Sequence, residues 1–318
     1  ERSCRAVREQ LTSDEEGRAR AVILTGKPVA DALSADTARR ARALRQRGVS
    51  PRLVILRCGE NEADGAYIRG AVKRGALCGV EVELRALPAE ASAAAVREAS
   101  RESNRAGSVH GCLLLRPLPP HLRAEEDGIC ACLDPRKDVD GMTPASAAGV
   151  YTGHGQGFAP CTAQACVELL RYYGVEMAGK HAVVIGRSAV VGRPAAMLLL
   201  REDAAVTVCH SRTPDTAALT RQADIIITAA GVRSSLTAAH VRPGQTVVDV
   251  SVNGNGSALC GDADFAAVEP VVDAITPVPG GVGAVTSSVL MAHTVRAAEL
   301  LAREGCLGIC FPRLRRWP

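Results

Sequence analysis

The stretch Val183-Val184-Ile185-Gly186-Arg187-Ser188-Ala189-Val190-Val191-Gly192-Arg193-Pro194 decides the fold of this chain. A short apolar strand, which ends at Ile185, runs into a glycine turn and then into the start of a helix. This arrangement directs backbone N–H groups and the positive end of a helix toward the turn, where the phosphates of a dinucleotide can bind. Glycine turns also occur in α/β loops for purely geometric reasons, so the pattern needs support from its surroundings.

That support comes from the next strand of the same unit, which ends at Cys209-His210-Ser211-Arg212-Thr213. A domain that prefers NAD usually offers an Asp or Glu here to the ribose 2′-hydroxyl, and this stretch has neither. Arg187, Ser211 and Arg212 can instead donate hydrogen bonds to a 2′-phosphate, which a carboxylate would repel. The sequence therefore predicts a dinucleotide site that prefers NADP.

Outward from this stretch, short β-branched runs alternate with amphipathic helical windows, which is typical of an α/β fold with a parallel sheet. The first unit is expected to have strands at 54–56, 80–84 and 109–115 and helices at 66–78 and 90–104. The second is expected to have a helix at 162–173 and strands at 182–185, 206–209, 225–228 and 247–250. A last helix is expected at 285–303.

The predicted boundaries give two domains. A first α/β domain covers 21–145 and is completed by a helix at 285–305 that returns to it, while an NADP-binding Rossmann domain covers 146–284. The segment 134–155 is rich in Gly, Asp, Pro and Thr, and it is expected to connect the two domains.

Composition excludes several classes of protein. The formal net charge is only +4, the basic residues are scattered, and aromatic residues make up 3%, so nucleic-acid binding is not expected. No run of 18 apolar residues occurs, so no membrane span is expected. Residues 1–20 and 306–318 are expected to be loosely ordered tails, and the first is too acidic for a transit peptide. These features predict a cytoplasmic protein.

The twelve cysteines do not predict a metal site. The close pairs are Cys130/Cys132, Cys161/Cys166 and Cys306/Cys310. None of these pairs has C-x-x-C spacing or a histidine at zinc-ligand distance. We interpret the cysteines as reduced thiols, mostly buried, in a reducing compartment.

Further stretches stand in a fixed order around the glycine turn. The longer ones are Lys137-Asp138-Val139-Asp140-Gly141, Gly186-Arg187-Ser188 with Val191-Gly192 and Pro194, and Pro277-Val278-Pro279-Gly280-Gly281-Val282-Gly283. The shorter ones are Val109-His110-Gly111, Pro160-Cys161-Thr162 and Thr207-Val208-Cys209-His210-Ser211. Together they resemble the signatures of FolD-type methylenetetrahydrofolate dehydrogenase/cyclohydrolases, over roughly residues 22–303.

The resemblance implies a two-domain enzyme, usually a homodimer, with a folate cleft between a catalytic domain and a Rossmann domain. Such enzymes oxidise 5,10-methylenetetrahydrofolate by hydride transfer to NADP and hydrolyse the methenyl product to 10-formyltetrahydrofolate. The expected partners are therefore tetrahydrofolate derivatives and a second copy of the chain.

The resemblance also assigns site residues by position. Tyr67 matches the tyrosine that stacks on the aminobenzoyl ring of the substrate, and Asp140 matches the acid that binds the pterin. Both are expected in the catalytic site. The substrate site is expected to include Pro279, Gly280 and Gly281 as well. The expected cofactor-binding residues are Gly186, Arg187, Ser188, Gly192, Ser211, Arg212 and Val252.

Two departures from the family pattern concern its hydrolytic half-reaction. The family's catalytic lysine corresponds to Ala71 and its glutamine partner to Leu115, and neither side chain can move a proton. Arg74, seven residues after Tyr67 on the same helix face, and Arg116 are candidate replacements, although an arginine is a poor base. We expect the dehydrogenase activity to be retained and the cyclohydrolase activity to be weak.

Three other interpretations are open at this point. One is a catalytically inactive homologue that only binds folate or nucleotide, and another is a Rossmann dehydrogenase for a hydroxy or amino acid. The third is a cysteine-based redox or metal protein. The stretches at 137–141 and 277–283 disfavour the second, and the cysteine spacing disfavours the third.

Overall fold

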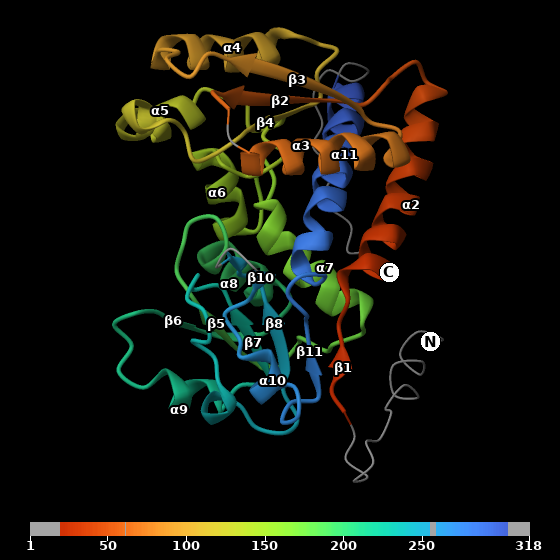
Figure 1. Ribbon diagram of the computed structural model, residues 1–318. Coiled ribbons are helices and arrows are strands. Elements are labelled where there is room, and N and C mark those ends of the chain that lie inside the picture. The colour runs from red at the N-terminus through yellow and green to blue at the C-terminus, as the bar shows by residue number, and fades with distance from the viewer. Residues whose placement is uncertain (1–19, 61, 255–258, 305–318) are drawn as a thin grey trace. The chain divides into compact units, whose positions relative to one another are not determined.

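The computed structural model describes residues 20–60, 62–254 and 259–304, which form two compact units (Figure 1). Unit 1 comprises residues 20–34 and Asp140–Leu290, and unit 2 comprises Ala35–Val139 and residues 291–304. The expected α/β fold with parallel sheets is confirmed. The predicted tails at 1–20 and 306–318 lie outside the described residues, apart from Arg20.

Unit 1 contains a six-stranded sheet in the order β1-β11-β8-β7-β5-β6, and every neighbouring pair is parallel. The strands are β1 (Val22–Ile23), β5 (His181–Ile185), β6 (Ala205–Cys209), β7 (Ile225–Thr228), β8 (Thr246–Asp249) and β11 (Ala274–Ile275). The central strands β5 and β7 are mostly apolar because helices and loops bury both faces of the sheet.

The helices of unit 1 connect these strands. They are α6 (Pro144–Thr152), α7 (Cys161–Tyr172), α8 (Gly192–Arg201), α9 (Thr216–Thr220) and α10 (Phe265–Val268), with the 3-10 turns η2 (Ala238–His240) and η3 (Val282–Ala284). A small antiparallel pair, β9 (Asn253–Gly254) with β10 (Leu259–Cys260), follows β8. Two long helices, α2 (Gly26–Arg45) and α11 (Thr286–Glu304), begin in unit 1 and end in unit 2.

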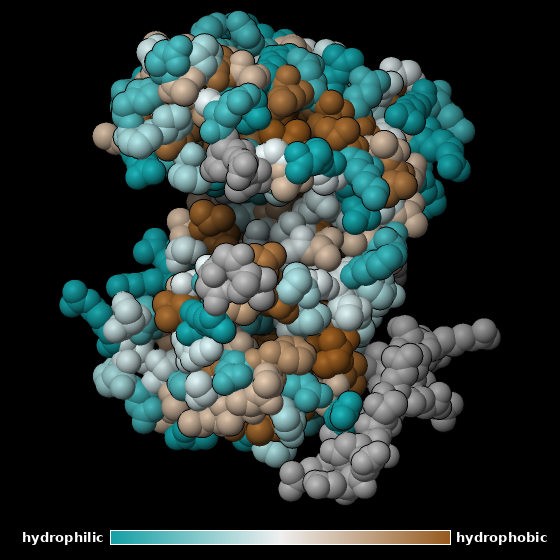
Figure 2. Space-filling view, in the orientation of Figure 1, coloured by the Kyte–Doolittle hydropathy of each residue, from teal (hydrophilic) through white to brown (hydrophobic). Residues whose placement is uncertain are grey.

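Unit 2 is built on a three-stranded parallel sheet in the order β3-β2-β4. Its further elements are β2 (Arg52–Cys58), α3 (Glu62–Cys78), β3 (Glu81–Leu87), α4 (Ala93–Arg105), β4 (Gly111–Leu114), η1 (Pro120–Glu125) and α5 (Glu126–Cys130). The outer face of α4 is charged, and Figure 2 shows the hydrophilic surface over it at the top of the view.

Two contacts establish which helix covers which face of this sheet. On one face, Gly75 of α3 approaches β3 so closely that a Cβ atom there would lie 2.5 Å from Val82 Cγ2 and 3.6 Å from Met291 Sδ of α11. On the other face, Arg85 of β3 donates to the hydroxyl of Ser103 in α4. Thus α3 and α11 pack on one face and α4 on the other, as Figure 1 also shows.

The predicted strands and helices are confirmed with small shifts at their ends. The prediction of a plain connection at 134–155 is wrong in part, because this segment contains α6. The Thr143 hydroxyl caps that helix by accepting from Ser146 N–H, and Gly153 ends it with φ = 77°. Helix α2 and strand β1 were not predicted, and β1 pairs with β11 in the sheet of unit 1.

Candidate functional site

The turn after β5 requires glycine at both ends. Gly186 has φ = 122°, and a Cβ atom there would lie 2.3 Å from the carbonyl oxygen of Ala229. A Cβ atom at Gly192 would lie 2.2 Å from the Gly186 carbonyl oxygen. The Ser188 hydroxyl lies across the turn and accepts from the N–H groups of Val191 (3.1 Å) and Gly192 (3.3 Å). The backbone is therefore held close to the start of α8.

This turn lies at the point where the strand order reverses. Strand β6 pairs with one side of β5 and β7 pairs with the other, which makes the carboxyl end of β5 the usual ligand-binding crevice of such a sheet. The predicted cofactor residues follow the carboxyl ends of three strands: Gly186, Arg187 and Ser188 follow β5, Ser211 and Arg212 follow β6, and Val252 follows β8.

The donors at this edge suit a phosphorylated dinucleotide. Arg187, Ser188, Ser211 and Arg212 are all exposed, so their hydroxyl and guanidinium groups can reach a ligand. No carboxylate stands in the stretch 209–213 after β6. Two guanidinium groups at one edge therefore fit the extra phosphate of NADP.

A buried carboxylate shapes the neighbouring loop after β7. Asp262 is fully buried and accepts hydrogen bonds from three successive backbone N–H groups, those of Ala230 (2.6 Å), Gly231 (3.1 Å) and Val232 (2.8 Å). Its other donors are Thr228 Oγ1 (3.2 Å), Ser251 Oγ (2.8 Å) and Asn253 Nδ2 (3.1 Å). Asp262 thus fixes the backbone beside the Gly186 turn.

A second buried carboxylate, Asp249, stands at the end of β8. It accepts from the N–H groups of Ser251 (3.2 Å), Asp262 (3.1 Å) and Ala263 (2.7 Å). Gly261 packs directly on it, since a Cβ atom there would lie 1.9 Å from Asp249 Oδ2. Burial raises the pKa of Asp249 to about 6, and the charge of Asp262 adds to the effect.

Neither acid was predicted from the sequence. Their donors come from segments separated along the chain, so no local spacing links them. A short Gly-Asp-Ala run at 261–263 is the only sequence signal, and it resembles an ordinary turn.

The predicted substrate loop follows β11. Pro279 and Gly280 are exposed, and Gly280 has φ = 103°. The Gly280 carbonyl accepts from the N–H of Gly26, the first residue of α2 (2.7 Å). Gly281 is buried with no room for a side chain, because a Cβ atom would lie 2.5 Å from the Pro277 carbonyl oxygen. This glycine run therefore presents backbone rather than side chains.

Asp140 stands at the amino end of α7. Its Oδ1 accepts from the backbone N–H of Cys161, the first residue of that helix, at 3.4 Å. The positive end of a helix favours the ionised carboxylate there. The residue as a whole is partly exposed.

Lys137, three residues earlier, has a structural contact. Its buried ammonium donates to the carbonyl oxygens of Ser103 (3.0 Å), Asn104 (2.8 Å) and Ala106 (2.8 Å) at the carboxyl end of α4. Burial lowers the pKa of this ammonium. The lysine of the 137–141 stretch therefore caps a helix.

Comparison with known proteins identifies the family. The family description "Tetrahydrofolate dehydrogenase/cyclohydrolase, catalytic domain" matches residues 24–140, and "Tetrahydrofolate dehydrogenase/cyclohydrolase, NAD(P)-binding domain" matches residues 160–302. This chain belongs to the tetrahydrofolate dehydrogenase/cyclohydrolase family. The expected resemblance is confirmed, and the second matched domain is an NAD(P)-binding domain.

Individual relatives of the family agree along nearly their whole length. The bifunctional protein FolD of Carboxydothermus hydrogenoformans is 44% identical over 87% of this chain and 97% of its own. That of Paracidovorax citrulli is 44% identical over 89% of this chain and 99% of its own.

Solved structures of FolD enzymes also match most of this chain. The bifunctional FolD enzyme from Campylobacter jejuni superposes with a TM-score of 0.84 at 35% identity, covering 88% of this chain and 99% of its own. The Trypanosoma brucei FolD, solved with NADP and an inhibitor, has a TM-score of 0.83 at 34% identity and covers 89% of this chain and 99% of its own.

The family's catalytic-domain positions lie on α3 in unit 2. Tyr67 is half-buried, and Ala71, one turn later on the same side of the helix, is fully buried. Arg74 is also partly buried on this helix. Tyr67 and Arg74 therefore belong to unit 2, whereas Asp140 and the Gly186 turn belong to unit 1.

Leu115, at the family's glutamine position, directly follows β4. Its N–H donates to the Leu56 carbonyl (2.9 Å), and its side chain is partly exposed. The next residue, Arg116, lies 3.7 Å from Glu126 Oε1 at the start of α5. The Arg116 side chain is thus engaged with α5.

No helix in the described ranges is long and apolar enough to cross a bilayer. Nor do three His, Cys, Asp or Glu side chains of the described residues gather as a metal site would require.

Proposed function

We propose that this chain is an NADP-dependent methylenetetrahydrofolate dehydrogenase with weak cyclohydrolase activity, acting in the cytoplasm as a homodimer. The observation that carries the cofactor preference is the carboxyl edge of β5 and β6. There the glycine turn stands beside exposed Arg187 and Arg212, and no acid follows β6 in residues 209–213. Membership of the family supplies the substrate class, reduced folate.

In this proposal the chain acts mainly by positioning. NADP, when bound, supplies the acceptor for a hydride ion. Tyr67 would stack on the aminobenzoyl ring of the folate, and Asp140 would hold the pterin through hydrogen bonds. The backbone of the loop 277–283 would approach the ligands closely, since glycines leave it uncovered. Orientation of this kind is the main requirement for a hydride transfer.

The domain assignment is part of the same proposal. Folate binding is assigned to residues 21–145 with the helix at 285–305, and cofactor binding to residues 146–284. Tyr67 on α3 supports the first assignment, and the Gly186 turn with the Asp262 loop supports the second.

The cyclohydrolase half-reaction lacks its usual groups. Water attack on the methenyl carbon needs a residue that takes up a proton, and neither Ala71 nor Leu115 can do so. Arg74 is the catalytic candidate that the sequence offers on α3. It stays protonated at neutral pH, so it could stabilise charge without acting as a base.

The test is a pair of assays on the purified full chain. The first follows NADPH or NADH formation from methylenetetrahydrofolate, and the second follows loss of methenyltetrahydrofolate absorbance. We expect turnover with NADP, much less with NAD, and hydrolysis close to the buffer rate. Absence of any NADPH formation would refute the dehydrogenase assignment, and fast hydrolysis would refute the proposed loss of the second activity.

A further inference from the structure

Arg57 is the penultimate residue of β2, at the carboxyl edge of the unit 2 sheet. Strand register pairs Leu53 with Gly111 and Ile55 with Leu113, so continuation of this register puts Arg57 level with Leu115 on the neighbouring strand. Paired residues of adjacent strands point to the same face. Arg57 and Leu115 therefore share one face of the sheet at its carboxyl edge.

That face is the one covered by α3. Val82 meets Gly75 of α3, and Val82 pairs with Leu53, so Leu53 points toward α3. Side chains alternate along a strand, and Arg57, four residues later, points to the same side. Arg57 is thus directed under α3, where the fully buried Ala71 also faces the sheet.

Tyr67 lies at the same level along the sheet. From Gly75 back to Tyr67 the helix rises about 12 Å toward the carboxyl edge. From Val82 to Ala86, the β3 partner of Arg57, the strand advances about 13 Å in that direction. Tyr67 on α3 and Arg57 on the sheet beneath that helix therefore lie at one height.

The Arg57 guanidinium has an unfilled hydrogen-bond donor. Its Nε atom is buried without a partner, and the whole side chain is only 16% exposed. The terminal Nη2 is 3.2 Å from Glu60, but the Glu60 side chain is 88% exposed, so that pair is a weak surface contact. A buried unsatisfied donor in a native fold needs an explanation, and a ligand acceptor is one.

We propose that Arg57 binds the folate substrate, donating from its guanidinium to an oxygen acceptor of the molecule that Tyr67 contacts. The inference rests on the proposed function and names the residue that provides a cation beside Ala71 and Leu115. Arg74 and Arg116 were the sequence candidates for that role. Arg116 pairs with Glu126, which is only 28% exposed. Arg57 is directed under α3, and its partner Glu60 is 88% exposed. Because a guanidinium does not give up its proton, Arg57 would bind and orient without restoring hydrolysis.

The experiment compares Arg57→Met with Arg116→Met, a matched loss of one arginine on the adjacent strand. For Arg57→Met we expect the KM for methylenetetrahydrofolate to rise about tenfold or more, with the KM for NADP changed by less than about twofold. Calorimetric titration with tetrahydrofolate alone should show the same loss of affinity. Arg57→Lys should recover part of it, since a lysine keeps the charge but not the planar fork.

The outcomes separate this inference from the proposed function. Three results would overturn the role of Arg57: equal effects of the two methionine variants, a rise of both KM values in Arg57→Met, or an unchanged KM for folate in Arg57→Met. If the wild type still turns over, the proposed function is upheld in each case. If the wild type forms no NADPH but binds tetrahydrofolate, and Arg57→Met loses that binding, the proposed function is overturned and the role of Arg57 is upheld. Binding of tetrahydrofolate that is equal in all variants would overturn the inference, whatever the activity.

Discussion

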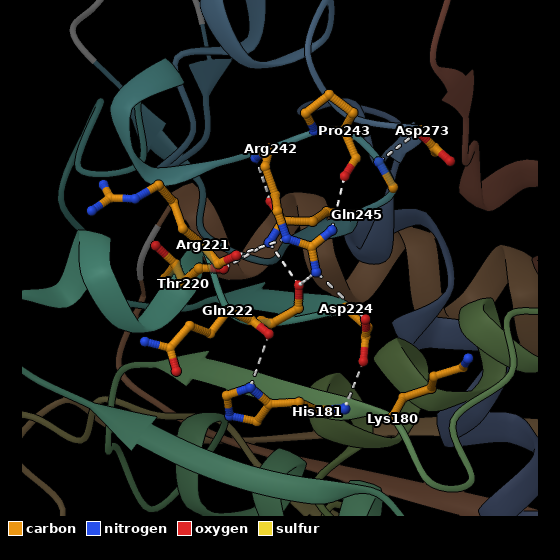
Figure 3. A network of polar contacts seen from close by, with 12 residues as sticks. Lys180, His181, Thr220, Arg221, Gln222, Asp224, Arg242, Pro243, Gln245 and Asp273 are labelled. Atoms are coloured by element: carbon orange, nitrogen blue, oxygen red, sulfur yellow. Dashed lines mark hydrogen bonds and ion pairs between the residues drawn. The ribbon is translucent and has the colours of Figure 1, made fainter.

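The two edges of the unit 1 sheet are built on different principles. At the amino edge, shown in Figure 3, Gln245, Arg242 and Asp224 bond directly to strand ends and to the segments before them. At the carboxyl edge, two buried carboxylates bond almost entirely to loop N–H and hydroxyl groups. Within the described residues neither carboxylate has an ion-pair partner. One edge is closed for stability, and the other is shaped to receive a ligand.

The buried polar groups at the amino edge form hydrogen bonds with one another. Gln245 is fully buried and donates to the carbonyl oxygens of Thr220 and Ala223, both at 2.7 Å, while its own oxygen accepts from Arg242 N–H at 2.7 Å. Asp224 accepts from the N–H of His181, the first residue of β5, at 2.9 Å. Changes here should therefore alter stability and leave ligand binding intact.

The largest expected difference between the two edges comes from a pair of glycine substitutions, one at each end of β5. Gly186→Ala would force a Cβ atom into the Ala229 carbonyl, so we expect the KM for NADP to rise about a hundredfold or activity to vanish. Gly179→Ala, at the amino edge, has φ = 72° but open space around it. It should lower stability by about 1 kcal/mol and leave the KM for NADP unchanged.

Steady-state kinetics would measure the KM for NADP of each variant, and a thermal melt would measure its stability. Similar KM values for the two alanine variants would contradict the distinction between the edges. A folded Gly186→Ala protein with normal NADP affinity would contradict the site itself.

A smaller effect is expected from Asp262→Asn. An amide offers one acceptor oxygen where the carboxylate serves six donors, so the loop 230–232 should loosen. We expect the KM for NADP to rise about tenfold. Its counterpart is Gln245→Leu, which leaves buried backbone groups unpaired and should lower stability by about 2 kcal/mol without changing that KM.

Fluorescence titration with NADPH and urea unfolding of both variants test this pair. If Gln245→Leu weakened NADPH binding as much as Asp262→Asn, the loss would reflect general destabilisation. Asp262 would then have no specific part in holding the loop.

The smallest effect concerns pH. Because burial raises the pKa of Asp249 from 3.8 to about 6, the folded protein holds this proton more tightly than the unfolded chain does. The stability it contributes is present below about pH 4 and is lost as pH rises to about 6. Asp249→Asn should remove this decline, which urea unfolding at several pH values would detect. An unchanged pH profile in the variant would contradict the raised pKa.

How far the sequence predicts the fold depends on whether the signal is local. Strands such as β7, with three consecutive isoleucines, are evident because burial on both faces demands an apolar run. Helix α6 was missed because Gly, Ser and Thr around it are typical of a connection, although Thr143 and Gly153 are its caps. Strand β1 is only two residues long and is defined by a partner at the far end of the chain.

The site shows the same division. The glycine turn at 186–192 is contiguous, so its backbone geometry could be anticipated. Asp262 could not, because its six donors come from the segments 228–232 and 251–253. Arg57 was missed for a related reason: only the register of β2 against β4 puts it beside Leu115. Contacts between residues far apart in the sequence leave no periodic pattern from which they could be predicted.

Strand β1 has a consequence for how this protein can be made and divided. Val22 pairs with Ala274, so the sheet that carries the nucleotide site is complete only when two segments far apart in the sequence have met. A fragment starting at residue 160 would leave the outer side of β11 bare, an open edge prone to pair with other molecules. On the ribosome, too, β1 must wait for its partner β11 to be made.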